Sequence, residues 1–208
     1  MTKQVKSKLP KVILFDADGT LFESAHLHFE AHRRTAHELH GYDYSKELFD
    51  THIWRGQKTS SDVLAEQGID VDPHEYTERK KAHYKQLVND ELAPHEGLVD
   101  FLDWCHEHSI RRVVVSAGRR ADIEAALNAA GIEKYFEVII GREDVGGKDK
   151  PHPFPYETGL RAVGFAAKDA IAVEDSDKGI SSAKAAGLRC IAITNQSNNI
   201  PNELDKAD

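Results

Sequence analysis

The sequence predicts an α/β fold, in which a Rossmann-like parallel sheet core carries an inserted all-helical cap domain. Five short runs rich in Val and Ile are nearly continuous rather than alternating, which is typical of strands covered on both faces. Helical patterns lie between the later runs, and strand alternating with helix favours a parallel sheet with right-handed crossovers. The interval after the first run is too long for one crossover and has mostly helical signals.

The elements of the core follow from these runs. We expect strands at 11–15, 111–116, 136–141, 170–174 and 189–194. Helical periodicity predicts helices at 97–108, 120–130, 155–163 and 177–186.

The insertion is expected to cover residues 24–94, with the core formed by 1–23 and 95–208. Gly41 suits the C-cap of a first cap helix. The stretch "SSDVLAEQG" predicts a short helix with a serine cap, and Pro73 after Asp72 marks the start of another.

Composition narrows the class of protein. Hydrophobic residues make up 40% of the 208 residues, the net charge is -8, and the pI is near 5.8. Without a broad positive field, the chain is not expected to bind nucleic acid or an anionic membrane. No apolar run approaches membrane-helix or signal-peptide character, so we expect a cytoplasmic protein, a monomer or weak dimer, in which Cys105 and Cys190 are buried, reduced thiols.

Polar residues stand at the end of four predicted strands, where ligands bind in open parallel sheets. They are Asp16, Asp18 and Thr20, with Gly19 between the last two; Ser116, followed by Ala117; Lys148 and Lys150; and Glu174, Asp175 and Ser176. Four carboxylates in one place repel one another unless a hard cation such as Mg²⁺ lies among them. A lysine and a serine hydroxyl remain for an anion, and this combination favours phosphoryl transfer.

The motifs "DADGT", "VVVSAG", "KPHPFPY" and "VEDSDKGISSAKAAG" resemble the four ordered motifs of the haloacid dehalogenase superfamily. The insertion is similar to the small helical cap of the subgroup that includes β-phosphoglucomutase and phosphoglycolate phosphatase. The segment "FESAHLHFEAH" resembles the hinge and first cap helix of the β-phosphoglucomutase branch. The resemblance implies Mg²⁺-dependent hydrolysis of a phosphate monoester of a small metabolite, through an aspartyl-phosphate.

The resemblance also implies roles for individual residues. Asp16 would be the nucleophile and Asp18 the general acid and base. Mg²⁺ would be held by the Asp16 carboxylate, the Asp18 backbone carbonyl and Asp175, with Glu174 acting through a water or as an alternative ligand. Predicted substrate-binding residues are Ser116, Ala117, Lys150 and Thr20 in the core and His28, Arg55 and Lys58 in the cap. Phe154 departs from the family, which often has an acidic residue there, and we expect altered support around Lys150.

Other interpretations remain beside this one. A β-phosphoglucomutase-like mutase is the alternative function, although Thr59 stands where a second phosphate-gripping arginine is expected. A dehalogenase would not need Asp18 or Mg²⁺, and a non-enzymatic binding module would normally lack one charged group of the set. A zinc site at His28 and His32 lacks further ligands. We expect Lys148 to be a solvated loop residue and Ser176 a helix cap.

Overall fold

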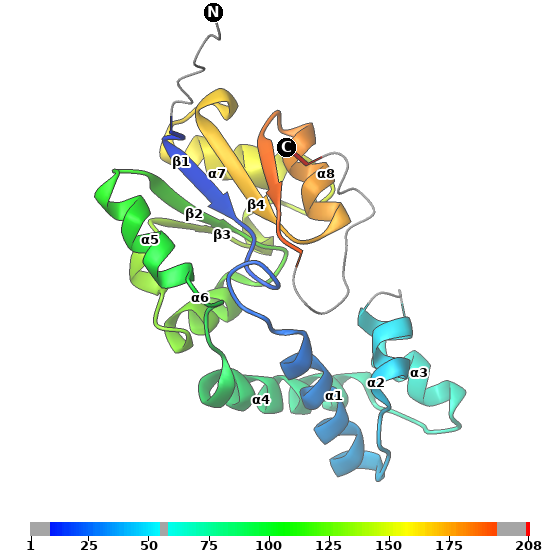
Figure 1. Ribbon diagram of the computed structural model, residues 1–208. Coiled ribbons are helices and arrows are strands. Elements are labelled where there is room, and N and C mark those ends of the chain that lie inside the picture. The colour runs from blue at the N-terminus through cyan, green and yellow to red at the C-terminus, as the bar shows by residue number, and fades with distance from the viewer. Residues whose placement is uncertain (1–8, 55–57, 195–206) are drawn as a thin grey trace, which may run out of the picture. The chain divides into compact units, whose positions relative to one another are not determined.

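The computed structural model describes residues 9–54, 58–194 and 207–208 (Figure 1). The chain divides into two compact units. Residues up to Phe22 and from Pro94 onward form the unit called here the core unit, and Glu23–Ala93 form the helical unit. The sequence placed these boundaries one residue later on each side.

The core unit is built on a five-stranded parallel sheet in the order β3-β2-β1-β4-β5 (Figure 1). The strands are β1 (Val12–Phe15), β2 (Arg111–Val115), β3 (Val138–Ile140), β4 (Ala170–Glu174) and β5 (Arg189–Ala192). Val12 of β1 lies opposite Arg111 on one side and Ala170 on the other. All five predicted strands are present, and the predicted fold class is confirmed.

Helices cover both faces of this sheet. They are α5 (Leu98–Glu107), α6 (Arg120–Ala129), α7 (Phe154–Val163) and α8 (Asp177–Ala185). Short 3₁₀ turns at Glu133–Tyr135, Arg142–Asp144 and Ala167–Asp169 complete the connections. Helices α7 and α8 pack against each other and against the strands, whereas α5 contacts β2 and α6 contacts β3.

Side chains of β1 point alternately to the two faces of the sheet. Leu14 belongs to the same buried cluster as Tyr156 and Leu160 of α7. The ring of the next residue, Phe15, makes an edge contact with Phe101 of α5 at 6.3 Å between centroids. Because successive strand side chains point to opposite faces, α7 and α5 lie on opposite sides of the sheet.

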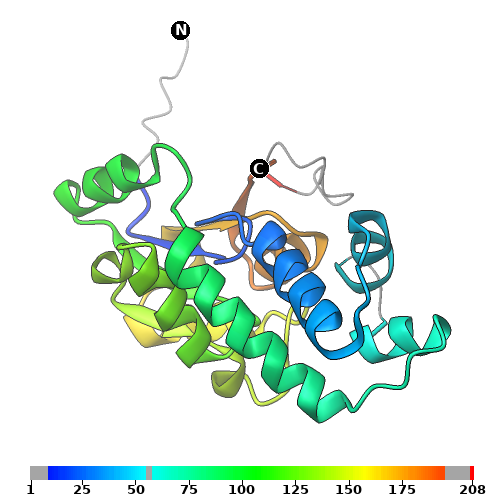
Figure 2. The same ribbon diagram turned by 90° about the horizontal axis from the view of Figure 1, so that it is seen from below.

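The helical unit contains α1 (Ala25–His40), α2 (Lys46–Leu48), a π-helical turn at Phe49–Trp54, α3 (Ser60–Glu66) and α4 (Pro73–Glu91). Helices α1 and α4 lie side by side (Figure 2). A small core of this unit joins α1, α3 and α4 through Ala36, Tyr44, Val63, Leu64 and Tyr76.

Most helix ends follow the sequence signals. Gly41 ends α1 at φ 64°, and Asp72 caps α4 by accepting the His74 N–H at 2.8 Å. The predicted serine cap of α3 is wrong, because Thr59 is the N-cap and forms a reciprocal capping box with Asp62. Serine and threonine are both good caps, but the acidic residue three positions on matches Thr59.

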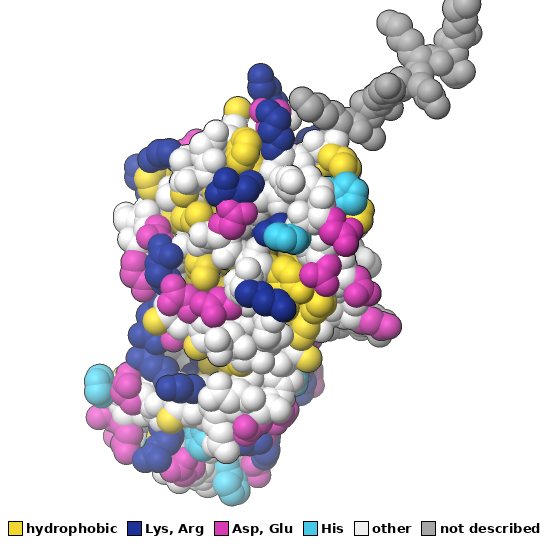
Figure 3. Space-filling model, turned by 90° about the vertical axis from the view of Figure 1, so that its left-hand side faces the viewer, with side chains coloured by type: hydrophobic (Ala, Val, Ile, Leu, Met, Phe, Trp, Pro, Cys, Tyr) yellow, Lys and Arg dark blue, Asp and Glu magenta, His cyan; other side chains and the backbone are white. Residues whose placement is uncertain are grey.

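The described surface mixes both signs of charge. Basic and acidic side chains are interspersed on the face drawn in Figure 3. No helix within the described residues has the length and apolar character needed to cross a membrane. Cys105 and Cys190 are both buried and free, as the sequence predicted.

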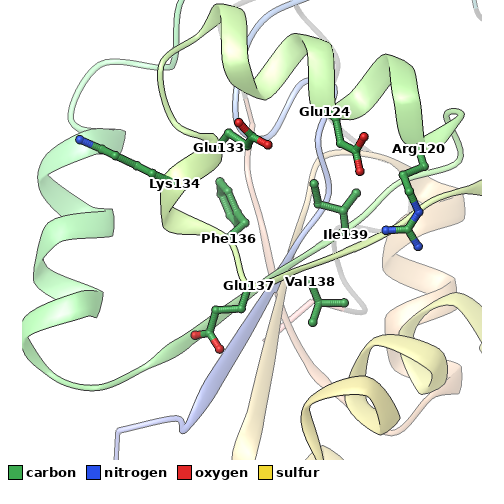
Figure 4. Close-up of a pocket in the computed structure, with 8 residues that line it drawn as sticks. All are labelled: Arg120, Glu124, Glu133, Lys134, Phe136, Glu137, Val138 and Ile139. Atoms are coloured by element: carbon green, nitrogen blue, oxygen red, sulfur yellow. The ribbon is translucent and has the colours of Figure 1, made fainter.

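A pocket of about 470 Å³ lies beside β3 and α6 (Figure 4). Phe136, Val138 and Ile139 supply its apolar lining, and the charged side chains around them are Arg120, Glu124, Glu133, Lys134 and Glu137. None of the predicted site residues lines it, so this pocket does not mark the candidate active site.

Candidate active site

Asp16 lies directly after β1, where the sheet continues one residue further through its backbone. Its N–H donates to the Val173 carbonyl at 2.9 Å, which fixes the residue between β1 and β4. The chain then turns, because the Leu21 N–H donates to the Ala17 carbonyl at 2.8 Å. The turn is therefore positioned by main-chain bonds at the carboxyl end of the sheet, the usual place for ligand sites in this architecture.

Lys150 is the residue that joins the strand ends. Its Nζ donates to Asp16 Oδ1 at 2.6 Å, to Glu174 Oε1 at 2.6 Å and to the Val115 carbonyl at 2.8 Å. Its side chain is only 6% exposed. Three separate strands thus meet at one buried ammonium group, and the structure places Lys150 rather than Lys148 there.

Lys148 has different surroundings, although it lies two residues from Lys150. It is exposed, and its Nζ stands 4.9 Å from the ring centroid of Phe154. The expectation of a solvated loop residue agrees with this exposure.

Glu174 is fully buried at the end of β4 and accepts from several donors. The Tyr156 hydroxyl donates to Oε1 at 2.6 Å. The Asp175 N–H and the Ser176 hydroxyl donate to Oε2 at 3.2 and 3.3 Å. A buried carboxylate needs such partners to remain charged. Ser176 is also the N-cap of α8, as predicted, since its Oγ accepts the Gly179 N–H at 3.2 Å.

Two glycines allow the carboxylates to reach their positions. A Cβ on Gly179 would lie 2.0 Å or less from the carboxylate atoms of Glu174. Gly19 has φ +82°, and a Cβ there would lie 2.0 Å from Asp175 Oδ2. Any larger residue at either position would displace a carboxylate of the site.

The charges of this cluster are strongly coupled. Burial raises the pKa of Asp16 well above its ordinary value, and Glu174 and Asp175 raise it further, while Lys150 acts in the opposite direction. Burial, followed by Glu174, raises the pKa of Asp175 to about 7. Burial disfavours the ammonium form of Lys150, yet the carboxylates of Asp16 and Glu174 raise the pKa of Lys150 above its ordinary value. Lys150 alone therefore does not relieve the repulsion among the carboxylates.

The donor set fits a hard divalent cation. Asp16, Glu174 and Asp175 each offer a carboxylate oxygen, and these oxygens lie within 4.8 Å of one another. Mg²⁺ prefers oxygen ligands and retains waters, which suits an incomplete ring of carboxylates. A bound cation would also lower the raised pKa values of Asp16 and Asp175.

Ser116, Ala117 and Thr20 lie near the same end of the sheet. The Ser116 Oγ is buried and accepts the Gly118 N–H at 3.0 Å, and the Ala117 carbonyl accepts from Arg142 Nε at 3.2 Å. The Thr20 hydroxyl is buried, and it has no hydrogen-bond partner among the described residues. A buried, unpaired hydroxyl is costly unless a ligand completes it.

His28 lies on α1 of the helical unit, in contact with α4. Its ring stacks on Tyr84 at 4.2 Å between centroids, and its Nδ1 is 3.5 Å from Lys80 Nζ. Burial, followed by Lys80, lowers the pKa of His28 well below its ordinary value. His28 is therefore a neutral, stacked imidazole beside a cation.

The other cap predictions have separate outcomes. Lys58 forms an ion pair with Glu66 at 2.7 Å on the surface of the helical unit. Arg55 lies outside the described residues. The roles of His28, Arg55 and Lys58 in substrate binding stay predictions.

The sequence did not predict two side chains that contact candidate site residues, Tyr156 beside Glu174 and Lys80 beside His28. Tyr156 is the third residue of α7, and the sequence gives no signal for its bond to Glu174. Lys80 lies on the cap helix α4, and the sequence gives no signal for its contact with His28 on α1.

Known proteins with similar sequences and structures cover nearly the whole chain. Residues 13–193 match the haloacid dehalogenase-like hydrolase family. The validoxylamine A 7'-phosphate phosphatase of Streptomyces hygroscopicus subsp. limoneus is 31% identical over 88% of this chain and 85% of that protein. The phosphorylated carbohydrates phosphatase of Thermotoga maritima is 25% identical over 87% of this chain and 83% of that protein.

A solved structure is also similar to this chain. CbbY from Rhodobacter sphaeroides, in complex with xylulose-(1,5)bisphosphate, has a TM-score of 0.71 and 28% identity, and the match covers 90% of this chain and 87% of that chain. The family match, residues 13–193, spans the whole helical unit and most of the core unit. The chain therefore belongs to the haloacid dehalogenase-like hydrolase family and is one of its phosphatases.

Proposed function

We propose that the chain is a Mg²⁺-dependent phosphomonoester hydrolase that forms an aspartyl-phosphate on Asp16. The observation that carries this proposal is the buried Lys150 ammonium, which bridges Asp16 and Glu174 at 2.6 Å each. Such an arrangement holds a carboxylate nucleophile beside a cation that can also contact phosphoryl oxygens. Asp175 follows Glu174 in the chain and lies close to Gly19.

The reaction has two steps in which this chain's residues change bonds. A carboxylate oxygen of Asp16 forms a bond to phosphorus while the ester P–O bond breaks, and Asp18 gives a proton to the departing alkoxide. Water then attacks the aspartyl-phosphate, Asp18 takes its proton, and the bond between Asp16 and phosphorus breaks to release phosphate. Lys150 and the Ser116 hydroxyl hold phosphoryl oxygens throughout.

Mg²⁺ would be held by the Asp16 and Asp175 carboxylates and the Asp18 backbone carbonyl, with Glu174 acting through a water or as an alternative ligand. When bound, it supplies positive charge that stabilises the developing negative charge on the phosphoryl group. The raised pKa of Asp175 and the mutual closeness of the three carboxylates support this assignment.

The proposed substrate is a small phosphorylated metabolite, and phosphorylated carbohydrates are the first class to test. Two relatives are named for validoxylamine A 7'-phosphate and for phosphorylated carbohydrates, and CbbY was solved with xylulose-(1,5)bisphosphate. His28, Arg55, Lys58 and Thr20 remain predicted substrate contacts. The buried hydroxyl of Thr20 has no hydrogen-bond partner among the described residues, which supports its assignment.

The experiment is phosphate release from a panel of sugar phosphates by the purified chain, with and without Mg²⁺. We expect turnover that needs Mg²⁺, and a loss of at least about 10³-fold in Asp16→Asn, because the nucleophile is removed. Asp122→Asn is the matched control, since Asp122 is an exposed carboxylate paired with Arg119. Full activity of Asp16→Asn, or equal losses in both variants, would refute the proposal.

The mutase alternative is tested with the same preparation. Thr59, at the position where a second phosphate-gripping arginine is expected, donates its hydroxyl to Asp62 at 2.7 Å as part of a helix cap. This use of Thr59 favours hydrolysis. Conversion of one hexose phosphate isomer to another, faster than phosphate release, would favour the mutase instead.

A further inference from the structure

His152 lies two residues after Lys150 and contacts the start of α7 with its side chain. The formal N-cap of α7, Pro153, provides no side-chain hydrogen bond. Instead, the Phe154 N–H donates to His152 Nδ1 at 3.1 Å. Pro155 follows and has no N–H, so the imidazole satisfies the first donor of this helix end, a group that otherwise lacks an intrahelical partner.

The backbone of His152 is held as well. Its carbonyl accepts the hydroxyl of Ser182 at 2.6 Å, and Ser182 is fully buried on α8. Its N–H donates to the Asp149 carbonyl at 2.9 Å, which closes the turn that contains Lys150. His152 thus ties the lysine-bearing turn to two helices, through the imidazole to α7 and through the carbonyl to α8.

The ring of Phe154 adds support from cations. Lys148 Nζ lies 4.9 Å and Arg161 Cζ lies 5.6 Å from its centroid, and its ring makes an edge contact with the His152 ring at 6.3 Å. Phe154 also packs against the buried cluster of the sheet. The residue that departs from the family pattern is therefore fixed by aromatic and cation–π contacts rather than by a carboxylate.

We propose that His152 is a positioning residue: its imidazole caps α7 and holds the turn that places Lys150 against Asp16 and Glu174. The proposal rests on the proposed function for the role of Lys150 as a phosphate ligand. His152 touches neither substrate nor reacting atoms, and it acts through the position of Lys150. The sequence alone does not reveal this role, because an exposed histidine between two prolines resembles an ordinary loop residue.

The test compares three variants in steady-state hydrolysis and in inhibition by inorganic phosphate. In His152→Ala the acceptor is lost, and we expect kcat to fall about tenfold and the inhibition constant for phosphate to rise by a similar factor. In His152→Asn the side-chain oxygen can accept the N–H two residues on, as in an Asx turn, so activity should stay within about twofold of the parent.

His108→Ala is the matched control, since His108 also lies at a helix end, where its Nδ1 is 2.8 Å from the Trp104 carbonyl. It should change thermal stability alone. A purely structural role for His152 would lower the melting temperature of His152→Ala and leave kcat and phosphate inhibition unchanged well below that temperature. That result, or a failure of His152→Asn to restore activity, would overturn the proposal.

If the proposed hydrolase function is wrong, the results for the three chains differ from those above. If the parent chain hydrolyses no ester, calorimetric titration with inorganic phosphate in the presence of Mg²⁺ still reports on Lys150. Weaker phosphate binding in His152→Ala than in the parent and His152→Asn would then support positioning without hydrolysis. Equal binding in all three would reject it.

Discussion

Tyr156 and Lys150 donate to the same oxygen, Oε1 of Glu174, each at 2.6 Å. Tyr156 comes from α7 and Lys150 from the turn before it, while Glu174 ends β4. The hydroxyl and the ammonium approach a carboxylate that is fully buried. A short, charge-assisted hydrogen bond of this kind orients its acceptor as well as stabilising it. Tyr156 is therefore part of what holds the carboxylate cluster in place.

Tyr156→Phe removes only the hydroxyl, so it measures this bond directly. We expect the free energy of unfolding to fall by about 2 kcal/mol, because hydrogen bonds to charged groups contribute about 1.5–3 kcal/mol. Activity should fall several-fold as Glu174 loses its orientation. Urea unfolding and steady-state kinetics provide the measurements.

Tyr135→Phe is the control for Tyr156→Phe. Tyr135 also donates to a carboxylate, that of Asp103 at 2.8 Å, but Asp103 is exposed. Its loss should cost at most about 1 kcal/mol and leave kcat unchanged. Similar losses of stability and activity in the two variants would mean that the bond to Glu174 has no special role.

Lys150→Met tests which lysine the site uses. The variant keeps much of the side-chain volume but leaves buried carboxylates without their cation, and breaking such a pair costs about 3–5 kcal/mol. Because burial already raises the pKa of Asp16, this carboxylate can take up a proton, and we expect a loss near the lower limit, about 3 kcal/mol. Activity should fall at least about 10²-fold, measured as phosphate release.

Lys148→Met is the matched change two residues earlier. Lys148 is exposed and contacts the ring of Phe154, so its loss should reduce activity by no more than about threefold. If Lys148→Met were the more damaging variant, the assignment of Lys150 to the phosphate would be wrong.

Much of the fold could be predicted because local sequence and tertiary structure agree. The run from Val12 to Phe15 is buried throughout, and continuous apolar character is what a central parallel strand requires. The polar residues at the ends of β1 and β4 were found by the same logic. A parallel sheet brings the carboxyl ends of its strands to one edge, so that Asp16 and Glu174 meet at Lys150.

The contacts that were not predicted depend on side-chain directions, which residue spacing does not determine. Whether Tyr156 bonds Glu174 or only fills the core depends on how α7 is rotated on the sheet. The His152 cap depends on a single rotamer within a turn. At α3, a serine cap was predicted, and the reciprocal bond with Asp62 shows that Thr59 is the cap instead.

Gly19→Ala tests whether close approach, rather than backbone conformation alone, requires glycine in the turn after β1. Gly19 and Gly97 have nearly the same φ, +82° and +78°, so alanine is strained by about 1–2 kcal/mol at both. Only at Gly19 would the new Cβ meet Asp175 Oδ2, at 2.0 Å, whereas nothing lies within 4 Å at Gly97.

The two alanine variants should therefore differ in metal dependence. We expect Gly19→Ala to raise the Mg²⁺ concentration for half-maximal activity about tenfold, since it moves a proposed ligand. Gly97→Ala should lower stability and leave that concentration unchanged. Identical Mg²⁺ dependence in both variants would show that Asp175 moves aside without consequence.

His32 makes the stability of the helical unit depend on pH. Its Nδ1 lies 2.8 Å from the Ser60 hydroxyl oxygen and 3.4 Å from the Tyr76 hydroxyl oxygen. Burial, followed by Lys80, lowers the pKa of His32 to about 3. In the unfolded chain the group titrates near its ordinary value of about 6.5.

The direction of the pH dependence follows from the folded and unfolded pKa values of His32. Because the folded pKa is depressed, the contribution of neutral His32 is complete above about pH 6.5 and is lost as the pH falls from 6.5 toward 3. One proton difference gives about 1.4 kcal/mol per pH unit, hence roughly 2 kcal/mol between pH 6.5 and pH 5. His28 contributes in the same direction, because its pKa is also lowered.

His32→Asn keeps an acceptor for Ser60 but cannot be protonated in this range. Its unfolding free energy should therefore fall less than that of the parent between pH 6.5 and pH 5, by about 2 kcal/mol. Parallel pH curves for the parent and His32→Asn would mean that His32 is protonated in the folded helical unit without cost, and that its bond to Ser60 does not require a neutral ring.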